Sequence, residues 1–307
     1  AGANPGPAAY GRGGTAPTVT DADLVAGRMD YVRWIREAAT LRTEGVKGIE
    51  HYDGFFPGFE PDALAPVLDA LRETGLKSAM LCFSPDFTHP DPVERARQLE
   101  RQREAIDLTL RLGARHCRTL SGQRHPGLTR REGLEHAVEA IRRSADYAER
   151  RGVVLCLENH YKDGRWRYPE FAQDEELFLE ILDRVQSPAL GVQYDPSNAI
   201  LAGLDPIRFL ERVRHRVVTM HASDRYLEPG ATLEDLRAAD GTIGYPEKLR
   251  HGEIGRGLVD YDAIFRILSE AGFDGWISVE DGLEGLDQLR RSVVFLAEKR
   301  RRYWPSD

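Results

Sequence analysis

The chain has 307 residues, 41% of them hydrophobic, and a formal net charge of −8. Its length suits one large domain, since a single α/β barrel runs to about 250 residues or more. The acidic charge argues against a nucleic-acid-binding protein, and no apolar run approaches the ~18 residues of a membrane span.

The first 20 residues are rich in Gly, Ala and Pro, and we interpret them as a lead-in to one domain over residues 21–307. The chain begins without the basic and then apolar pattern of a signal peptide. Cys82, Cys117 and Cys156 are odd in number and lie in or beside apolar strand candidates, which predicts buried free thiols. Both features predict a cytoplasmic protein.

From there the chain alternates short apolar runs with longer amphipathic ones, which predicts parallel strands joined by crossover helices. The predicted strands are 45–52, 77–83, 116–121, 153–158, 190–195, 217–222 and 276–280. The predicted helices lie near 28–43, 62–74, 92–112, 131–150, 175–185, 206–213, 260–271 and 284–301.

Local patterns support these helices. Asp91-Pro92 and Asp205-Pro206 place a cap residue before a proline at the first helical position. Glycines such as Gly152 follow helical runs, as is typical of helix ends.

This alternation predicts a (β/α)8 TIM barrel with two irregular features. The interval between the strands at 217 and 276 leaves room for a polar insertion over about 225–257. A barrel needs an eighth strand before the first helix, and the only candidate is the weak pattern around Thr15–Thr20.

Four predicted strands end on residues that can bind a hard metal ion: Glu158, Asp195, His221 and Glu280. In a parallel barrel the carboxyl ends of the strands converge on one face, where the active site lies. Three oxygen ligands and one nitrogen ligand suit Mn²⁺, Mg²⁺ or Co²⁺ better than a metal that prefers thiolate.

Each of these residues also has an ordinary structural interpretation. Glu158 could cap the next helix, and Asp195 lies in Asp-Pro-Ser-Asn, which is common turn chemistry. His221 could be a hydrogen-bonded core histidine, and Glu280 could be a loop acid. Four successive strand ends with this composition nevertheless favour a metal site over independent coincidences.

The motifs around these residues resemble the xylose isomerase-like TIM-barrel family of sugar isomerases and epimerases. The matching segments are LENH (157–160), GVQYDPSNA (191–199), HASD (221–224), GEIGRGLVDYDAI (252–264) and GFDGWISVEDG (272–282). The amino-terminal half is similar in rhythm, through GVKGIEHYDG (45–54) and LRLGARHCRTLSG (110–122).

The ketose 3-epimerase branch of this family implies one divalent ion bound by the positions of Glu158, Asp195, His221 and Glu280. Mn²⁺ is the expected ion, with Mg²⁺, Co²⁺ or Zn²⁺ as alternatives. The resemblance also implies that Glu158 and Glu280 act as an acid–base pair. Such an ion would chelate the substrate carbonyl and a neighbouring hydroxyl, so that one Glu removes the proton between them through an enediolate.

The sequence departs from that branch at two places. Asn198 stands where the branch has a histidine, and His160 follows Glu158 at a place where the branch has none. We predict that His160 is catalytic or binds substrate, although a loop histidine bonded to the backbone is an equal alternative. Trp166, Asn198, Asp224 and Arg225 complete the predicted substrate-binding set.

These features predict a metal-dependent isomerase or epimerase acting on a small carbohydrate. The alternative is a lyase similar to inosose dehydratases or C-glycoside deglycosidase catalytic subunits, which start with the same proton abstraction. DNA repair of the endonuclease IV kind is disfavoured by the net charge and by the few histidines at strand ends. A non-catalytic binding protein would bind no metal. We expect a homo-oligomer, or a small partner subunit in the deglycosidase case.

Overall fold

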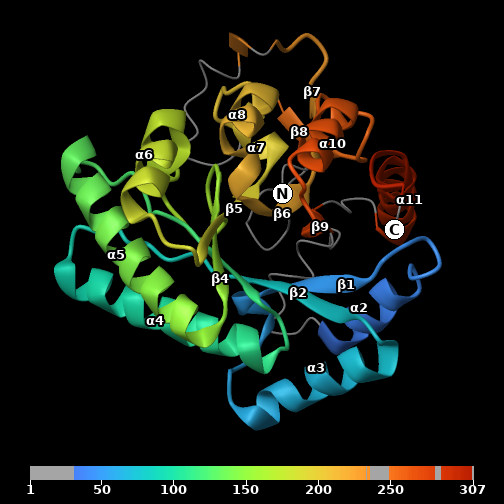
Figure 1. Cartoon of the computed structure of the whole chain (residues 1–307), viewed down its shortest axis with the longest axis horizontal. Coiled ribbons are helices and arrows are strands. Elements are labelled where there is room, and N and C mark those ends of the chain that lie inside the picture. The colour runs from blue at the N-terminus through green and yellow to red at the C-terminus, as the bar shows by residue number, and fades with distance from the viewer. Residues whose placement is uncertain (1–30, 233, 236–248, 281–284, 306–307) are drawn as a thin grey trace.

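The computed structural model describes residues 31–232, 234–235, 249–280 and 285–305. Seven parallel strands form one curved sheet in the order β1-β2-β3-β4-β5-β6-β9. Figure 1 shows these strands at the centre of the molecule with helices around them. The strands are Gly48–Tyr52 (β1), Lys77–Cys82 (β2), His116–Thr119 (β3), Val154–Glu158 (β4), Leu190–Tyr194 (β5), Val217–Ala222 (β6) and Trp276–Val279 (β9).

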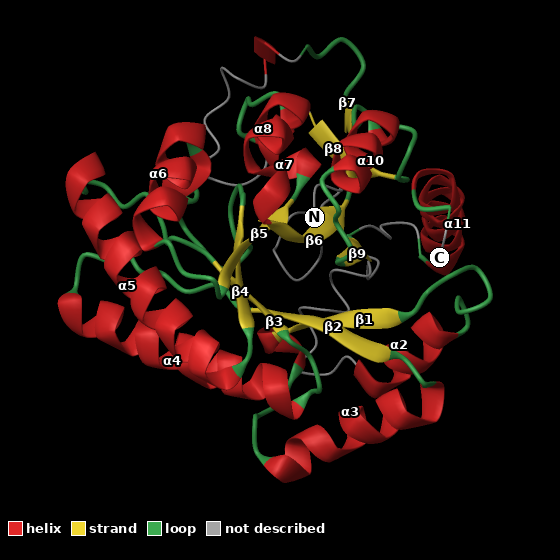
Figure 2. Ribbon diagram, in the orientation of Figure 1, coloured by secondary structure: helices red, strands yellow, loops and turns green. Residues whose placement is uncertain are grey.

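The helices follow the predicted alternation with the strands (Figure 2). They are Tyr31–Ala39 (α2), Pro61–Thr74 (α3), Pro92–Arg111 (α4), Arg130–Arg151 (α5), Glu175–Val185 (α6), Pro196–Leu201 (α7), Pro206–Val213 (α8), Tyr261–Glu270 (α10) and Leu286–Tyr303 (α11). Short 3-10 helices are Asp53–Phe55 (η2), Phe171–Gln173 (η3) and Arg214–Arg216 (η4).

The predicted helix caps are confirmed. The Asp91 carboxylate accepts from the N–H of Val93, and Asp205 accepts from the N–H groups of Ile207 and Arg208. Gly152 ends α5 with φ at 66°, a conformation that favours glycine because it has no Cβ.

The sheet is a nearly closed barrel. Its two ends, β1 and β9, approach each other so closely that a Cβ added to Gly48 would lie 3.1 Å from the ring of Trp276. The predicted TIM-barrel fold is therefore confirmed. The candidate first strand at Thr15–Thr20 and the lead-in over 1–20 lie outside the described residues.

The insertion before β9 differs from the predicted polar loop, because two of its segments pair as an antiparallel hairpin. Asp224–Leu227 (β7) and Leu249–Gly252 (β8) join in register from Asp224↔Gly252 to Leu227↔Leu249. This pairing joins segments more than 20 residues apart, so no local pattern of side chains could reveal it.

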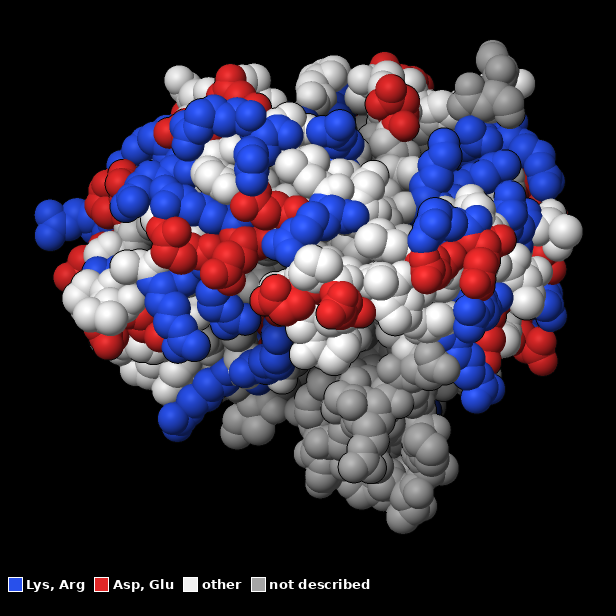
Figure 3. All heavy atoms as spheres, turned by 90° about the horizontal axis from the view of Figure 1, so that it is seen from below, with Lys and Arg blue, Asp and Glu red and all other residues white. Residues whose placement is uncertain are grey.

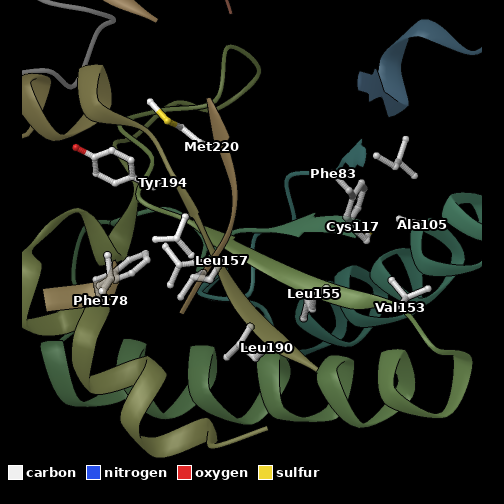
Figure 4. Close-up of a cluster of buried hydrophobic side chains, with 14 of the residues drawn as sticks. Phe83, Ala105, Cys117, Val153, Leu155, Leu157, Phe178, Leu190, Tyr194 and Met220 are labelled. Atoms are coloured by element: carbon white, nitrogen blue, oxygen red, sulfur yellow. The ribbon is translucent and has the colours of Figure 1, made fainter. Parts of the chain in front are cut away.

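The alternation of side chains along β4 directs its last residue into the barrel. Leu155 and Leu157 belong to the large apolar core that also contains Ala105 of α4 and Phe178 of α6 (Figure 4). Cys156 instead packs with Met80 and Cys82 of β2 in a separate inner cluster. Because side chains alternate with a period of two, Glu158 lies on the same inner side as Cys156, at the carboxyl end of the barrel.

All three cysteines are buried free thiols, as predicted. On the face shown in Figure 3, Lys and Arg side chains are interspersed with Asp and Glu rather than gathered in one continuous basic surface. None of the helices among the described residues is both long and apolar enough to cross a membrane.

Candidate active site

Three of the four predicted metal ligands meet at the carboxyl end of the barrel. One ligand atom from each of Glu158, Asp195 and His221 lies within 4.8 Å of the other two. Nδ1 of His221 lies 3.1 Å from Oε1 of Glu158 and 3.8 Å from Oδ2 of Asp195. All three residues are buried.

Glu280, the fourth predicted ligand, directly follows β9. Its backbone N–H donates to the carbonyl of Ala222 over 2.8 Å, which fixes the end of the strand. Its Oε2 lies 3.6 Å from Nδ1 of His221, while 48% of its side chain remains exposed. The three predicted carboxylate ligands therefore surround Nδ1 of the fourth, His221, and Glu280 is the carboxylate in contact with solvent.

The backbone around Asp195 determines which of its oxygens faces the cluster. Asn159 makes two hydrogen bonds with the Asp195 backbone, at 2.7 and 2.8 Å. Oδ1 caps α7 by accepting from the N–H groups of Ser197 and Asn198. Among the described residues, Oδ2 accepts only from the Asn198 amide, at 2.9 Å, and it lies on the His221 side. The turn role predicted for Asp195 and the metal role are therefore compatible, because one oxygen caps a helix and the other remains available to an ion.

The charged side chains of the cluster shift one another's pKa values. Burial, together with the negative charges of Glu280 and Glu158, raises the pKa of Asp195 to about 7. Burial alone would lower the pKa of His221, but Glu50, Glu280 and Glu158 outweigh it and hold that pKa well above its ordinary value. A buried group of carboxylates thus requires a positive charge at this point, which fits a divalent cation.

Glu158 makes different contacts through its two oxygens. Oε1 faces His221 and also accepts from the Asn198 amide at 3.2 Å. Oε2 accepts from Nη1 of Arg118 at 2.9 Å. Burial opposes ionisation of Glu158, but its electrostatic interactions with His160, His221 and Arg118 outweigh this effect and hold the pKa of Glu158 well below its usual range.

Arg118 is a buried residue of β3 that sequence reasoning missed. Its Nη2 also donates to Oγ of Ser84 at 2.7 Å and lies 3.8 Å from Asp163. An arginine in the middle of a predicted barrel strand was the available signal, because a buried charge requires a partner. Its partner could not be named from the sequence, since Glu158 lies 40 residues further along the chain.

The loop from β4 to η3 extends over the carboxyl end of the barrel. Asp163 anchors this loop to the segment after β2 by accepting from Oγ of Ser84 at 2.6 Å. Arg165 contacts the end of β1. Its Nη2 donates to Asp53 at 2.8 Å, and its guanidinium carbon lies 4.7 Å from the centre of the Tyr52 ring. This loop holds His160 and Trp166 beside the ligand cluster.

His160 is buried, with 8% of its surface exposed. Its Nδ1 has no hydrogen-bond partner among the described residues. The edge of its ring faces Trp166, with 6.5 Å between ring centroids. Burial lowers the pKa of His160, so the neutral imidazole is favoured.

A polar cavity of about 390 Å³ borders this arrangement. Ser84, Gln98, Arg101, Gln123 and Trp166 are among its lining residues. None of the predicted ligands lines it, and its link to the cluster runs through the contacts of Ser84 with Arg118 and of Trp166 with His160.

The other predicted substrate-binding residues have different surroundings. The Asn198 amide lies inside the cluster, between Glu158 and Asp195. Arg225 is fully buried in β7, and its carbonyl accepts from the N–H of Leu258. A role for Arg225 in substrate binding stays a prediction.

Asp224 organises the loop that contains the Gly-Glu-Ile-Gly-Arg-Gly motif. Its oxygens accept from the backbone N–H groups of Arg225, Gly255, Gly257 and Val259. A Cβ at Gly257 would lie 2.3 Å from the Asp224 carboxylate, so this position requires glycine. The motif is therefore explained by loop packing, and substrate binding by Asp224 stays a prediction.

Residues 38–299 match a family model described as xylose isomerase-like TIM barrel. The chain belongs to this family. The predicted resemblance is therefore confirmed. A hydantoinase/oxoprolinase model also matches, over residues 1–47 only.

Characterised relatives in the xylose isomerase-like family catalyse different reactions. An L-ribulose 3-epimerase of Methylomonas sp. is 25% identical over 69% of this chain and 66% of its own length. An inosose dehydratase of Geobacillus thermodenitrificans is 21% identical over 47% and 45%. A 3-oxo-isoapionate decarboxylase of Pectobacterium atrosepticum is 26% identical over 68% and 74%. The chain thus spans about two thirds of the epimerase and under half of the dehydratase.

Solved structures support the same fold. A xylose isomerase-like TIM barrel protein of Mycobacterium smegmatis, in complex with magnesium, has a TM-score of 0.67 at 18% identity. The alignment covers 88% of this chain and 89% of that one.

Replacing Arg118 by Met should destabilise the metal-free protein by about 3–5 kcal/mol, because it removes the buried cation bonded to Oε2 of Glu158. Saturating Mn²⁺ should restore part of this loss by supplying the missing positive charge. Urea unfolding with and without Mn²⁺ measures both effects. Arg97→Met, an exposed substitution on α4, is the control. A loss no larger than in the control would contradict the role of the buried pair.

The buried carboxyl group of Glu170 should make the stability of the folded protein depend on pH. Its Oε1 accepts from the N–H and hydroxyl of Ser121, and burial raises its pKa to about 8. Because this pKa is higher in the folded than in the unfolded chain, stability should fall as pH rises from about 4.5 to about 8.

The neutral variant Glu170→Gln should lack this fall, so its advantage over the parent protein should grow between pH 5.5 and pH 8.5. Urea unfolding of both proteins at the two pH values measures it. Glu139→Gln, an exposed change on α5, controls for loss of one carboxylate. An advantage that does not change with pH would show that Glu170 ionises normally.

Proposed function

We propose that this protein is a divalent-metal-dependent isomerase or epimerase acting on a small sugar or sugar derivative. The observation that supports it is the arrangement of Glu158, Asp195 and Glu280 around Nδ1 of His221. Mn²⁺ is the ion we favour, with Mg²⁺, Co²⁺ or Zn²⁺ as alternatives, because the ligands are mainly carboxylate oxygens. When bound, the ion would polarise a substrate carbonyl and stabilise the enediolate that forms beside it.

Glu280 is the best placed group to remove the substrate proton. It is the only one of the three cluster carboxylates with a large exposed fraction, so a substrate entering from solvent can reach it. Glu158 would hold the ion through Oε1, while its Oε2 is bonded to Arg118. An epimerase must then return a proton from the other face of the substrate, which either Glu158 or His160 would do.

A lyase remains the second candidate, and the surroundings of His160 favour it. A leaving group needs a proton donor and space. His160 would supply the proton through its Nδ1 once it is protonated during turnover, and the cavity beside Trp166 would supply the space. The dehydratase and decarboxylase relatives show that the family includes such reactions.

The substrate class, a cytoplasmic location, and a homo-oligomer or small partner subunit stay predictions. The net charge of −8 and the mixed charges in Figure 3 are consistent with a small-molecule substrate rather than a nucleic acid.

Incubation of the Mn²⁺-loaded protein with ketoses and keto-glycosides in D₂O tests the proposal. Deuterium uptake with an intact carbon skeleton supports the isomerase or epimerase, and loss of a substituent or of a carbon fragment supports the lyase. If no substrate in the panel shows deuterium exchange or bond cleavage, both proposals lose their support.

Glu280→Gln should lower the exchange rate by roughly 10²–10⁴-fold at saturating Mn²⁺, because the amide cannot accept the proton. His160→Ala should keep exchange but block leaving-group loss if His160 is the acid of a lyase. Glu270→Gln, exposed on α10, is the matched control. Undiminished exchange in Glu280→Gln would show that another group removes the proton.

A further inference from the structure

His221 lies between two different sets of neighbours. Nδ1 faces the predicted ligands Glu158, Asp195 and Glu280. Nε2 faces away from them and lies 2.6 Å from Oε1 of Glu50. The side-chain amide of Gln193 lies 2.5 Å from the same nitrogen. The two ring nitrogens therefore have separate partners, although the ring has a single orientation.

Glu50 comes from a distant part of the chain. It is the third residue of β1, 171 residues before His221. The thiol of Cys82, at the end of β2, donates to the same Oε1 of Glu50 at 2.9 Å. Glu50 is thus fixed by the neighbouring strand, and 17% of its side chain is exposed. Its position is set by the closure of the barrel, which brings β1 near β6 across the interior.

We propose that Glu50 is a positioning residue that orients His221 for metal binding. This inference rests on the proposed metal site. A carboxylate that accepts the N–H at Nε2 leaves the lone pair at Nδ1, where it is directed toward the ion. The negative charge of Glu50 also increases the basicity of the imidazole. Partners of this kind commonly change metal affinity by about 10–100-fold.

The alternative is that Glu50 is itself a ligand. Ligand atoms of Glu50, Cys82 and His221 also lie within 4.8 Å of one another, which is close enough for a separate ion. Two observations favour the positioning role. The thiol is engaged as a donor to Glu50, and burial raises the pKa of Cys82, so the thiolate that a metal requires is disfavoured.

Mn²⁺ binding to the parent protein and to Glu50 variants, measured by electron paramagnetic resonance, tests this role without any substrate. The Kd should rise about tenfold in Glu50→Gln, which keeps the acceptor oxygen but loses its charge. It should rise up to about 100-fold in Glu50→Ala, which loses both. The number of bound ions should stay at one per chain.

Two controls separate orientation from general damage. Cys82→Ser keeps a hydrogen-bond donor toward Glu50, so its Kd should stay within about threefold of the parent value. Glu104→Gln removes an exposed carboxylate on α4 and should leave the Kd unchanged. Thermal unfolding confirms that each variant is folded, and Glu50→Gln decides the question if Glu50→Ala does not fold.

Different results overturn different statements. A parent protein that binds no Mn²⁺ contradicts the proposed function itself. A parent that binds tightly, with an equal Kd in both Glu50 variants, overturns the positioning role alone. Two ions in the parent and one in Glu50→Ala would make Glu50 a ligand and would likewise overturn it. Cd²⁺ titration with the thiolate absorption band as readout identifies that case, because Cys82→Ser would abolish the band.

Discussion

The concentration of negative charge around His221, at the carboxyl end of the barrel, is the constraint on which the site depends. Glu158, Asp195, Glu280 and Glu50 all lie around the imidazole of His221. Carboxylates taken out of water repel one another and lose hydration, so they remain together only if a positive charge compensates them. In the protein alone His221 and Arg118 supply this charge, and a divalent cation would supply more of it at the place where the ligand atoms converge.

The first half of the barrel supports the ligands that the second half provides. β4, β5, β6 and β9 place the four predicted ligands, whereas Glu50 of β1 contacts His221 and Arg118 of β3 contacts Glu158. This division explains why the site needs a nearly closed barrel. The motifs of the second half determine which atoms would face the proposed ion, and the contacts from the first half hold those atoms in place. Support of this kind is what keeps a catalytic geometry precise.

Much of this could be predicted from the sequence because it depends on local patterns. The strand that ends at Glu158 and the caps at Asp91 and Asp205 follow from side-chain alternation and from proline positions. Contacts between strands distant along the chain could not be predicted. Glu50 and Arg118 were visible as charged residues inside predicted strands, but their partners depend on barrel closure. The hairpin of β7 and β8 was missed for the same reason, since its strands pair across the insertion. Asp195 was ambiguous because turn chemistry and metal binding use the same residue types.

Anomalous diffraction from crystals grown with Mn²⁺ tests the central claim most directly. Data collected at the manganese absorption edge should show one strong peak per chain among Oε1 of Glu158, Oδ2 of Asp195, Nδ1 of His221 and the carboxylate of Glu280. Each of these atoms should lie about 2.0–2.4 Å from the ion, and Glu50 should contact Nε2 of His221 but not the ion. A peak outside this cluster, or no peak at saturating Mn²⁺, would contradict the claim that the cluster is a metal centre.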